Sequence, residues 1–184
     1  AILPDKGGNL LLGTLSALVS FNPEKKSFTT IDKEKDGTPF TSQRITILFR
    51  DSHKRLWVGG EEGISVFQQE GIEIEKVPIL PESSVTKTFT NCIYEAANGI
   101  IWVGTREGFY CFNEKEKKIK RYTTANGLPN NVVYGILEDT FGRLWVSTNR
   151  GISCFNPETE RFRNFTESDG LQSNQFNTSS FCRT

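Results

Sequence analysis

The amino-acid sequence predicts an all-β fold: a β-propeller fragment of about four blades, each made of four antiparallel strands. Three observations lead to this prediction. The segment from Gly142 to Phe162 recurs upstream in imperfect copies, at intervals of about 45 residues. Each copy consists of short stretches rich in β-forming residues, separated by turns that contain Gly, Asn or Pro. The sequence contains no segment with a helical period and helix caps.

The repeat at residues 131–166 shows how the strands of one blade are recognised. The alternating run VVYGILED predicts the first strand and ends at Asp139, which opens a turn that Gly142 closes. The runs RLWVST, ISCFN and RFRNFT predict the second, third and fourth strands. The turns between them lie at 149–151, with Gly at the left-handed position, and at 156–158, with Asn before Pro. The other copies keep this register, so each predicts one blade.

One position on the predicted second strand carries a large aromatic side chain. It is Trp57, Trp102 and Trp145 in three copies, and Leu11 in the first copy. A large flat side chain in the middle of a strand can fill the wedge between adjacent blades. We therefore expect all three Trp residues to be mostly buried in the core, rather than exposed for stacking on a sugar.

The register of the copies predicts one partial propeller domain over residues 1–184. Its blades are expected at residues 1–43, 44–86, 87–130 and 131–173, and residues 174–184 enter the next blade. The chain is expected to begin within a repeat and to be a piece of a longer protein.

The two ends of the repeat array predict self-association. Asn9 to Ile31 read as the second, third and fourth strands of one blade, and Asn174 to Phe181 as a lone first strand. Such a piece exposes an apolar blade face at each end and an unpaired edge near Leu10 to Leu12. We therefore expect a homodimer in which the lone strand pairs with this edge in a second copy, closing a ring of about eight blades.

A second repeated element joins consecutive blades. It reads ANGLPNNVV at 125–133 and SDGLQSNQF at 168–176. Asn-Gly and Asp-Gly favour a turn, and the Leu that follows can pack back into the core. We align Asn130 with Asn174, and we expect both side chains to hydrogen-bond the backbone where the loop ends.

Composition excludes some classes of protein. The 22 Lys and Arg balance the 22 Asp and Glu, so the chain lacks the basic surface of a nucleic-acid-binding protein. No apolar run approaches the length of about 18 residues that crosses a membrane, so no membrane contact is expected for this chain. Cys111 and Cys154 share one repeat position, which predicts small buried side chains with free thiols rather than disulfide partners.

Motifs for catalysis are missing from the sequence. His53 is the one histidine, and a single His in a turn makes neither a catalytic triad nor a zinc site. The sequence has no nucleophile elbow, no phosphate-binding Gly loop and no calcium loop. We therefore predict no catalytic residue, no metal ligand and no cofactor.

The repeat resembles the two-component regulator propeller repeat, and the resemblance covers nearly the whole chain. The join N-G-L-x-x-N-x-V is also typical of that family. The first copy departs from the pattern, because Leu11 replaces Trp and Ser16-Ala17 replaces the usual Gly. The residues that match the pattern in the best copy are Glu138, Asp139, Gly142, Leu144, Trp145, Val146, Thr148, Gly151, Phe155, Asn156 and Pro157.

This resemblance implies a place in the extracytoplasmic, periplasmic sensor of a hybrid two-component histidine kinase of the Bacteroidetes. Such sensors respond to glycans, so the resemblance implies a non-enzymatic module and an oligosaccharide ligand for the intact receptor. Two alternatives stay open from the residues alone. One is a propeller-fold carbohydrate-active enzyme, a lyase or a glycosidase, and the other is a purely structural propeller for protein interaction.

Candidate ligand-binding residues come from the loops. The turns between second and third strands share one face of a propeller with the blade joins, and these loops vary between copies while the framework does not. The candidates on this face are Glu61, Glu62, Arg106, Glu107, Asn130, Asn131, Asn149 and Arg150.

Overall fold

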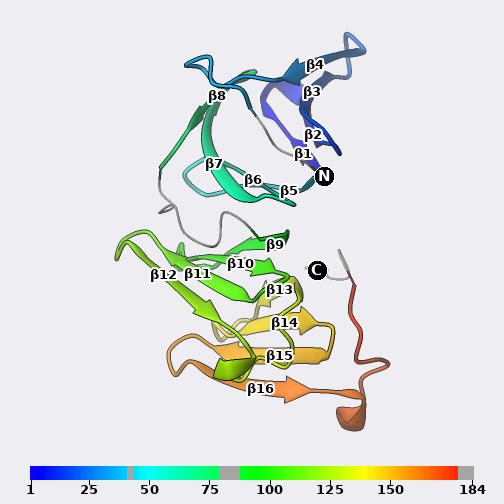
Figure 1. Cartoon of the computed structure of the whole chain (residues 1–184), viewed down its shortest axis with the longest axis vertical. Coiled ribbons are helices and arrows are strands. Elements are labelled where there is room, and N and C mark those ends of the chain that lie inside the picture. The colour runs from blue at the N-terminus through cyan, green and yellow to red at the C-terminus, as the bar shows by residue number, and fades with distance from the viewer. Residues whose placement is uncertain (41–43, 79–87, 178–184) are drawn as a thin grey trace. The chain divides into compact units, whose positions relative to one another are not determined.

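The computed structural model describes residues 1–40, 44–78 and 88–177 of the chain (Figure 1). The described residues form four antiparallel sheets of four strands, each a simple meander in sequence order. We call these sheets blades one to four. The prediction of an all-β propeller fragment is confirmed. The chain divides into two compact units, Ala1–Thr90 and Asn91–Thr184.

The first unit contains blades one and two. Its strands are β1 (Ile2–Pro4), β2 (Leu10–Gly13), β3 (Leu18–Asn22), β4 (Ser27–Ile31), β5 (Ile45–Arg50), β6 (Leu56–Gly60), β7 (Gly63–Glu70) and β8 (Glu73–Lys76). One core fills the space between the two blades, and it includes Leu11 and Leu18 from blade one and Leu56 and Phe67 from blade two.

The second unit contains blades three and four. Its strands are β9 (Thr90–Glu95), β10 (Ile101–Thr105), β11 (Phe109–Asn113), β12 (Lys118–Tyr122), β13 (Val133–Glu138), β14 (Leu144–Thr148), β15 (Gly151–Asn156) and β16 (Arg161–Phe165). Its core likewise joins residues of both blades, among them Trp102 and Phe109 from blade three and Leu144 and Phe155 from blade four.

The prediction that blade one lacks its first strand is wrong. Ile2–Pro4 forms β1 and pairs with β2, with Leu3 opposite Leu11. Three residues that include a Pro show no alternation, so the sequence carried no strand signal. Because β1 covers the edge at Leu10 to Leu12, that edge is not open to a strand from another copy. Residues 174–177 of the expected lone strand form no strand, and its remainder lies outside the described residues.

The three Trp residues lie on equivalent second strands, as predicted. Trp57 and Trp102 are 1% and 2% exposed, and Trp145 is half-buried. Trp102 stacks on Phe109 of its own blade at 4.8 Å between ring centroids. It also meets the edge of Phe155 from blade four at 5.6 Å. The indole therefore fills the wedge between two blades.

Glycines let adjacent blades approach each other closely. A Cβ atom on Gly104 of blade three would lie 2.5 Å from both Cys92 and Val133, the latter on the first strand of blade four. A Cβ atom on Gly13 of blade one would lie 2.4 Å from Ile45, on the first strand of blade two. Real Cβ atoms essentially never show contacts this short, so only Gly fits without a shift of the neighbouring side chains.

A polar clasp in the first turn holds the second strand of blades two and four. In blade four, Asp139 accepts hydrogen bonds from the Arg143 guanidinium (2.8 Å) and the Trp145 indole (3.0 Å). Asp51 makes the equivalent bonds in blade two, at 2.7 and 2.8 Å. Blade three has Ala96 at the Asp position, and this side chain is buried in the core instead.

A second polar contact ties each of two blades to the blade before it. Arg50, next to the clasp Asp of blade two, forms an ion pair with Asp5 in the first turn of blade one (3.0 Å). Gln69 donates to the other oxygen of Asp5 (2.9 Å). Glu138, at the same position in blade four, accepts from the backbone N–H of Ala97 in the first turn of blade three (2.9 Å).

Replacing Trp102 by Ala is expected to cost about 3–5 kcal/mol of unfolding free energy, because a large core side chain is removed and a cavity remains. Trp145→Ala provides the matched control, since Trp145 occupies the same repeat position but is half-buried. Its loss should be smaller. Denaturant titration measures both values, and a cost below about 1 kcal/mol for Trp102→Ala would contradict the role between blades.

The clasp predicts a specific dependence of stability on pH. Burial raises the pKa of the Asp139 carboxyl, but the hydrogen bonds from Trp145, Arg143 and Phe141 outweigh it and lower the pKa to about 2. An acid with a lowered pKa stabilises the fold fully above its unfolded pKa of about 4, and this contribution is lost as the pH falls toward about 2. Asp139→Asn should cost about 1–3 kcal/mol at neutral pH and almost nothing near pH 2.

Urea titrations of wild type and Asp139→Asn across this pH range test the clasp. Glu158→Gln, at an exposed position of the same blade, is the control for general acid effects. A difference between wild type and Asp139→Asn that stays constant from neutral pH down to about pH 2 would contradict this account.

The described cysteines, Cys92, Cys111 and Cys154, are free thiols. Burial raises the pKa of the Cys92 thiol to about 12 and that of Cys111 to about 11. Thiol reagents near pH 8 should therefore modify neither residue quickly in the folded chain. Denaturation without reductant should release all four thiols of the sequence, including Cys182, which lies outside the described residues. Titration of only two thiols would show a disulfide.

Candidate functional site

In blades three and four, the turn between the second and third strands is built by one Thr and one Gly. In blade three, the Thr105 hydroxyl accepts from the backbone N–H of Glu107 and donates to the carbonyl of Gly108, both at 3.0 Å. Thr148 makes the same pair of bonds in blade four, again at 3.0 Å. These internal bonds satisfy the turn backbone, so the two residues at each tip are left to vary without loss of the turn.

The Gly that closes each turn lies against the end of the fourth strand. Gly151 has φ of 95°, and a Cβ atom there would lie 2.1 Å from the carbonyl oxygen of Phe165. The equivalent distance from Gly108, with φ of 147°, to the carbonyl of Tyr122 is 2.7 Å. Both the left-handed backbone and the close approach require Gly. The tips are therefore presented on a rigid base.

The blade joins are held by their own polar side chains. The joins that follow blades three and four each form a short 3-10 turn, at Thr124–Asn126 and Glu167–Asp169, with a capping box at its start. The Asn131 side-chain oxygen accepts from the backbone N–H of Thr124 at 2.9 Å. Asn174 accepts from Glu167 N–H in the next join, also at 2.9 Å. This bond closes each join into a loop.

The predicted equivalence of Asn130 and Asn174 is wrong by one residue, because Asn131 makes the bond that Asn174 makes. Asn130 instead accepts from the N–H of Val132 at 2.8 Å, where Ser173 makes the corresponding bond in the next join. Two adjacent Asn residues allowed either alignment. The prediction that these side chains bond the loop backbone is confirmed.

The candidate residues all lie in loops, but some of their side chains bond the loop backbone and others are exposed. In the second unit, the join and the turn of blade four meet directly, since Gly151 N–H donates to the carbonyl of Asn174 at 2.6 Å. The side-chain oxygens of Asn130 and Asn131 hold the loop, as described above. Those that project outward at the turn tips are Arg106, Glu107, Asn149 and Arg150.

Glu107 has a neighbour at its turn tip. The Arg121 guanidinium donates to the Glu107 carbonyl at 3.0 Å from Nε, and it lies 3.8 Å from the Glu107 carboxylate. Both side chains of this ion pair are exposed, so it contributes little to stability. A ligand can therefore compete for Glu107 at small cost.

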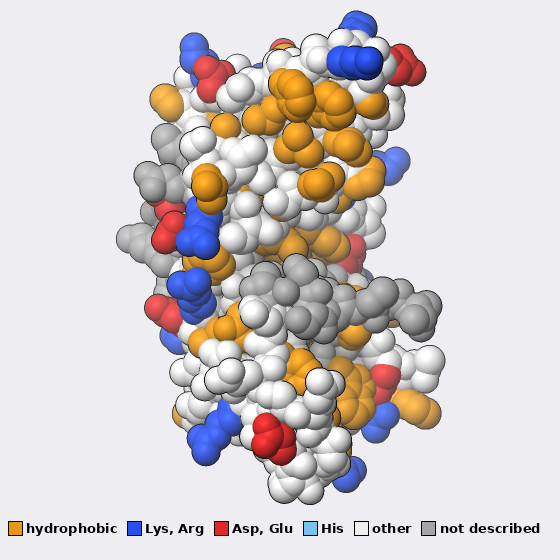
Figure 2. Space-filling view, turned by 90° about the vertical axis from the view of Figure 1, so that its right-hand side faces the viewer, with side chains coloured by type: hydrophobic (Ala, Val, Ile, Leu, Met, Phe, Trp, Pro, Cys, Tyr) orange, Lys and Arg blue, Asp and Glu red, His pale blue; other side chains and the backbone are white. Residues whose placement is uncertain are grey.

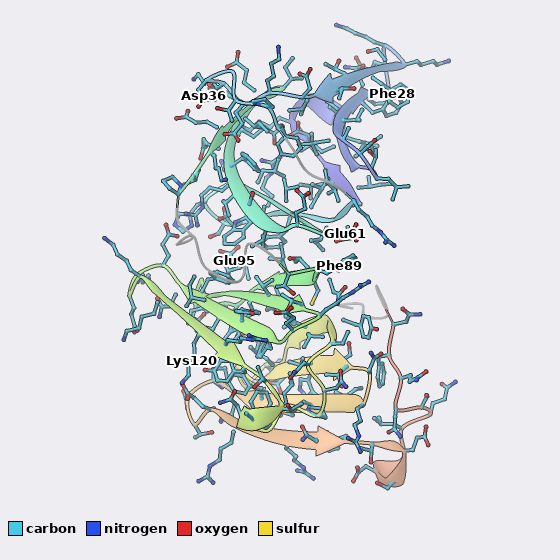
Figure 3. All side chains as sticks on the ribbon, viewed as in Figure 1. Phe28, Asp36, Glu61, Phe89, Glu95 and Lys120 are labelled. Atoms are coloured by element: carbon cyan, nitrogen blue, oxygen red, sulfur yellow. The ribbon has the colours of Figure 1, made fainter. Side chains whose placement is uncertain are left out.

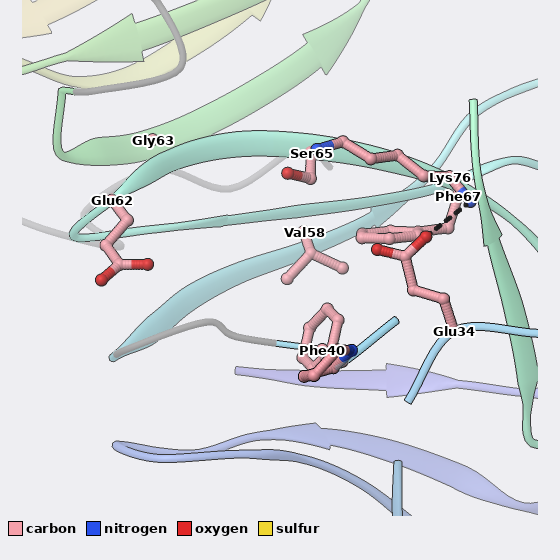
Figure 4. A pocket seen from close by; sticks show the side chains of 9 residues that line it. Glu34, Phe40, Val58, Glu62, Gly63, Ser65, Phe67 and Lys76 are labelled. Carbon is pink, nitrogen blue, oxygen red and sulfur yellow. Dashed lines mark hydrogen bonds between the residues drawn. The ribbon is translucent and has the colours of Figure 1, made fainter. Parts of the chain in front are cut away.

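Glu61 and Glu62 lie at the β6–β7 turn of the first unit, and both are exposed; Figure 3 labels Glu61. Glu62 also lines a pocket of about 120 Å³ beside blade two (Figure 4). None of the other candidates lines this pocket. Sequence reasoning had no signal for it, because its other walls come from a blade join and from the second, third and fourth strands of the blade.

The described residues contain neither a group of metal ligands nor a helix that could span a membrane. Across 1–40, 44–78 and 88–177, no three His, Cys, Asp or Glu side chains are grouped so that they could hold a metal ion. Within the same ranges, no helix has the length and apolar character needed to cross a membrane. His53 is exposed in its turn.

Sequence comparison identifies the repeat. A family model described as two component regulator propeller matches residues 83–107 and 127–150. A curated relative, histidine kinase P4 of Formosa agariphila, is 32% identical over an alignment of 133 residues, and the match covers 68% of this chain and 10% of that protein. The chain thus spans about a tenth of the length of the curated relative that it matches.

Structure comparison identifies the fold. The extracellular domain of a hybrid two-component system from B. thetaiotaomicron has a TM-score of 0.66 at 21% identity, over 96% of this chain and 30% of that chain. PorZ of the type-IX secretion system of Porphyromonas gingivalis scores 0.68 at 16% identity, over 95% and 28%.

A virginiamycin B lyase from Staphylococcus aureus scores 0.61 at 11% identity, over 89% of this chain and 54% of the lyase. At these identities the structural likenesses show the propeller fold alone, which sensors and enzymes share. The sequence match is what distinguishes them. The chain therefore carries repeats of the two-component regulator propeller family.

Proposed function

We propose that this chain is a non-enzymatic sensor module of a hybrid two-component histidine kinase. The observation that carries the proposal is the regulator propeller repeat itself, together with the identity to a histidine kinase over two thirds of the chain. In this role, the chain belongs to the extracytoplasmic, periplasmic part of the receptor and makes no membrane contact itself. It passes a ligand-dependent change in blade packing toward a kinase elsewhere in the protein.

The proposed ligand of the intact receptor is an oligosaccharide. The exposed turn tips offer amide, guanidinium and carboxylate groups. Amide and guanidinium N–H groups can donate hydrogen bonds to sugar hydroxyls, and amide and carboxylate oxygens can accept them. These groups stand on turns whose backbone is already satisfied and whose Gly residues are fixed. Ligand binding at the tips therefore costs little ordering of the loops.

An enzyme of propeller fold is the second candidate, because a lyase has the same fold. The two candidates differ in one measurable outcome. A sensor binds the oligosaccharide and leaves it intact, whereas a lyase or glycosidase converts it.

A homodimer is also proposed, on the basis of apolar side chains at both ends of the blade array. Phe28 stacks on Phe21 at 4.6 Å and is 66% exposed, and Ile2 is 70% exposed. Figure 2 shows hydrophobic side chains gathered over blade one, and Figure 3 labels Phe28 on its outer part. In blade four, Trp145 stacks on Phe165 and stays half-buried. Light scattering at high concentration measures the oligomeric state, and a stable monomer would contradict the dimer.

The sensor proposal predicts that an oligosaccharide changes the autophosphorylation of the intact receptor without being cleaved. The experiment screens an oligosaccharide panel by calorimetry and phosphorylation assay on the whole receptor, with chromatography of the sugar afterwards. Replacing both Asn149 and Arg150 by Ala should weaken binding roughly tenfold, since two hydrogen bonds are lost. Glu158→Ala, exposed elsewhere in blade four, is the control. Cleavage of the sugar would contradict the sensor proposal.

A further inference from the structure

The pocket beside blade two lies under the blade join at residues 32–40. Phe40 N–H donates to the carbonyl of Asp32 at 2.9 Å, just as Leu128 N–H donates to Thr123 at 3.2 Å in the join between blades three and four. Phe40 therefore occupies the Leu position of a longer join. Leu128 is 2% exposed and fills its site, whereas Phe40 is half-buried and lines an opening of about 120 Å³.

A change in the fourth strand forms the second wall of the pocket. In blades one and four, the Phe of the third strand packs on a Phe of the fourth. Phe21 stacks on Phe28 at 4.6 Å between ring centroids, and Phe155 lies tilted against Phe162 with the centroids 4.5 Å apart. In blade two, Lys76 stands opposite Phe67 instead. An aliphatic amine does not cover the ring as a second Phe does.

The edge of Phe40 contacts the Phe67 ring at 5.6 Å instead. The ammonium of Lys76 thereby becomes part of the pocket. A polar wall thus replaces an aromatic pair at this one place in the repeat array.

The rim of the pocket is held in place by hydrogen bonds to β8. Glu34 accepts from the backbone N–H of Lys76 at 3.2 Å, and Lys35 N–H donates to the carbonyl of Ile74 at 2.8 Å. Glu34 N–H also donates to Thr38 within the join at 2.8 Å. The Glu34 carboxylate is therefore positioned before any ligand arrives, which lowers the ordering cost of binding.

The pocket presents charges of both signs on different walls. Glu34 and Glu62 supply carboxylates, and Figure 4 shows them on opposite sides of Val58 and Phe40. The Lys76 side chain extends toward Ser65 along the upper wall in the same view. In the part of the chain that the structure describes, Lys76 forms no ion pair with either Glu. These charges can therefore engage a ligand.

The charge arrangement selects among small ligands. A simple anion would face two carboxylates, and a simple cation would face the Lys76 ammonium. A neutral sugar would make hydrogen bonds but would neutralise none of the charges. A zwitterion can pair its ammonium with the Glu34 carboxylate and its carboxylate with Lys76 and Ser65, giving charge-assisted bonds to both of its charged groups.

The size of the pocket limits the ligand further. A cavity of about 150 Å³ holds a benzene ring, so an open pocket of about 120 Å³ holds the small apolar part of a ligand while the ligand's charged groups lie at the rim. The faces of Phe40, Val58 and Phe67 suit a short apolar side chain that lies beside the ammonium and the carboxylate, which in an α-amino acid are both attached to Cα. We propose that the pocket binds a free α-amino acid with a small apolar side chain, such as valine. This proposal does not depend on the sensor function.

The test measures binding to the 184-residue chain by calorimetry and by amide chemical shifts at Gly63 and Ser65. The probes are L-valine, isobutylamine, which lacks its carboxylate, isovalerate, which lacks its ammonium, and D-glucose. L-valine should bind at millimolar concentration, and the two single-charge analogues at least about tenfold more weakly, since each loses one charge-assisted bond. Glucose binding as tight as that of valine would overturn the proposal.

Two variants locate the interaction. Lys76→Gln should weaken valine binding about tenfold and leave isobutylamine binding unchanged or stronger, because only the carboxylate contact is lost. Glu34→Gln should weaken valine and isobutylamine alike. Lys118→Gln, at an exposed position on β12 outside the pocket, is the control. Circular dichroism confirms that each variant is folded, and valine binding that neither pocket variant alters would overturn the proposal, as would no valine binding at all.

Discussion

Trp102 lies between two sheets, with Phe109 of its own blade stacked on one side and Phe155 of the next blade edge-on to it. A four-stranded sheet of this size cannot bury both of its faces by itself, so each core is shared with a neighbour. The glycine two residues after Trp102 makes this contact between the blades possible. Gly104 lets the first strand of the next blade approach to the distance at which the indole and that blade touch. The position of Trp102, the size of its side chain and the lack of a side chain at Gly104 are thus all set by how close the two sheets must come.

The clasp shows how the same constraint is met with different chemistry. In blade four, Asp139 binds the side chains of Arg143 and Trp145 and fixes the indole from its polar edge. In blade three the Asp and Arg positions are Ala96 and Ile100, which pack against the core around Trp102. An Asp alone in that setting would bury a charge without its partner. Blade one keeps the Asp as Asp5 but has Asn9 at the Arg position, and there Arg50 and Gln69 of blade two supply the partners of the carboxylate.

Most of the framework could be predicted from the sequence, because it repeats. The Trp position, the Thr and Gly of the turns and the strand patterns of the all-β class each recur in several copies. A chance match in one copy therefore does not mislead the prediction. Features that occur once were missed. Strand β1 is three residues with a Pro and has no pattern of its own, and it is recognised only by the strand that it pairs with. The adjacent Asn130 and Asn131 differ only in which backbone N–H they bind. The pocket needs a longer join and Lys76 together, and no local pattern links the two.

The contacts that reach back from one blade to the one before it give the array a direction. Arg50 serves the first turn of blade one, and Glu138 serves that of blade three, and in both cases the later blade supplies the side chain. Removing the later blade of a unit therefore leaves the first turn of the earlier blade without its hydrogen-bond partner. Removing the earlier blade removes that turn as well. During synthesis the earlier blade emerges first and must wait for its partner. Within each unit, the later blade thus completes the first turn of the earlier one, and that turn is satisfied only after the later blade has been made.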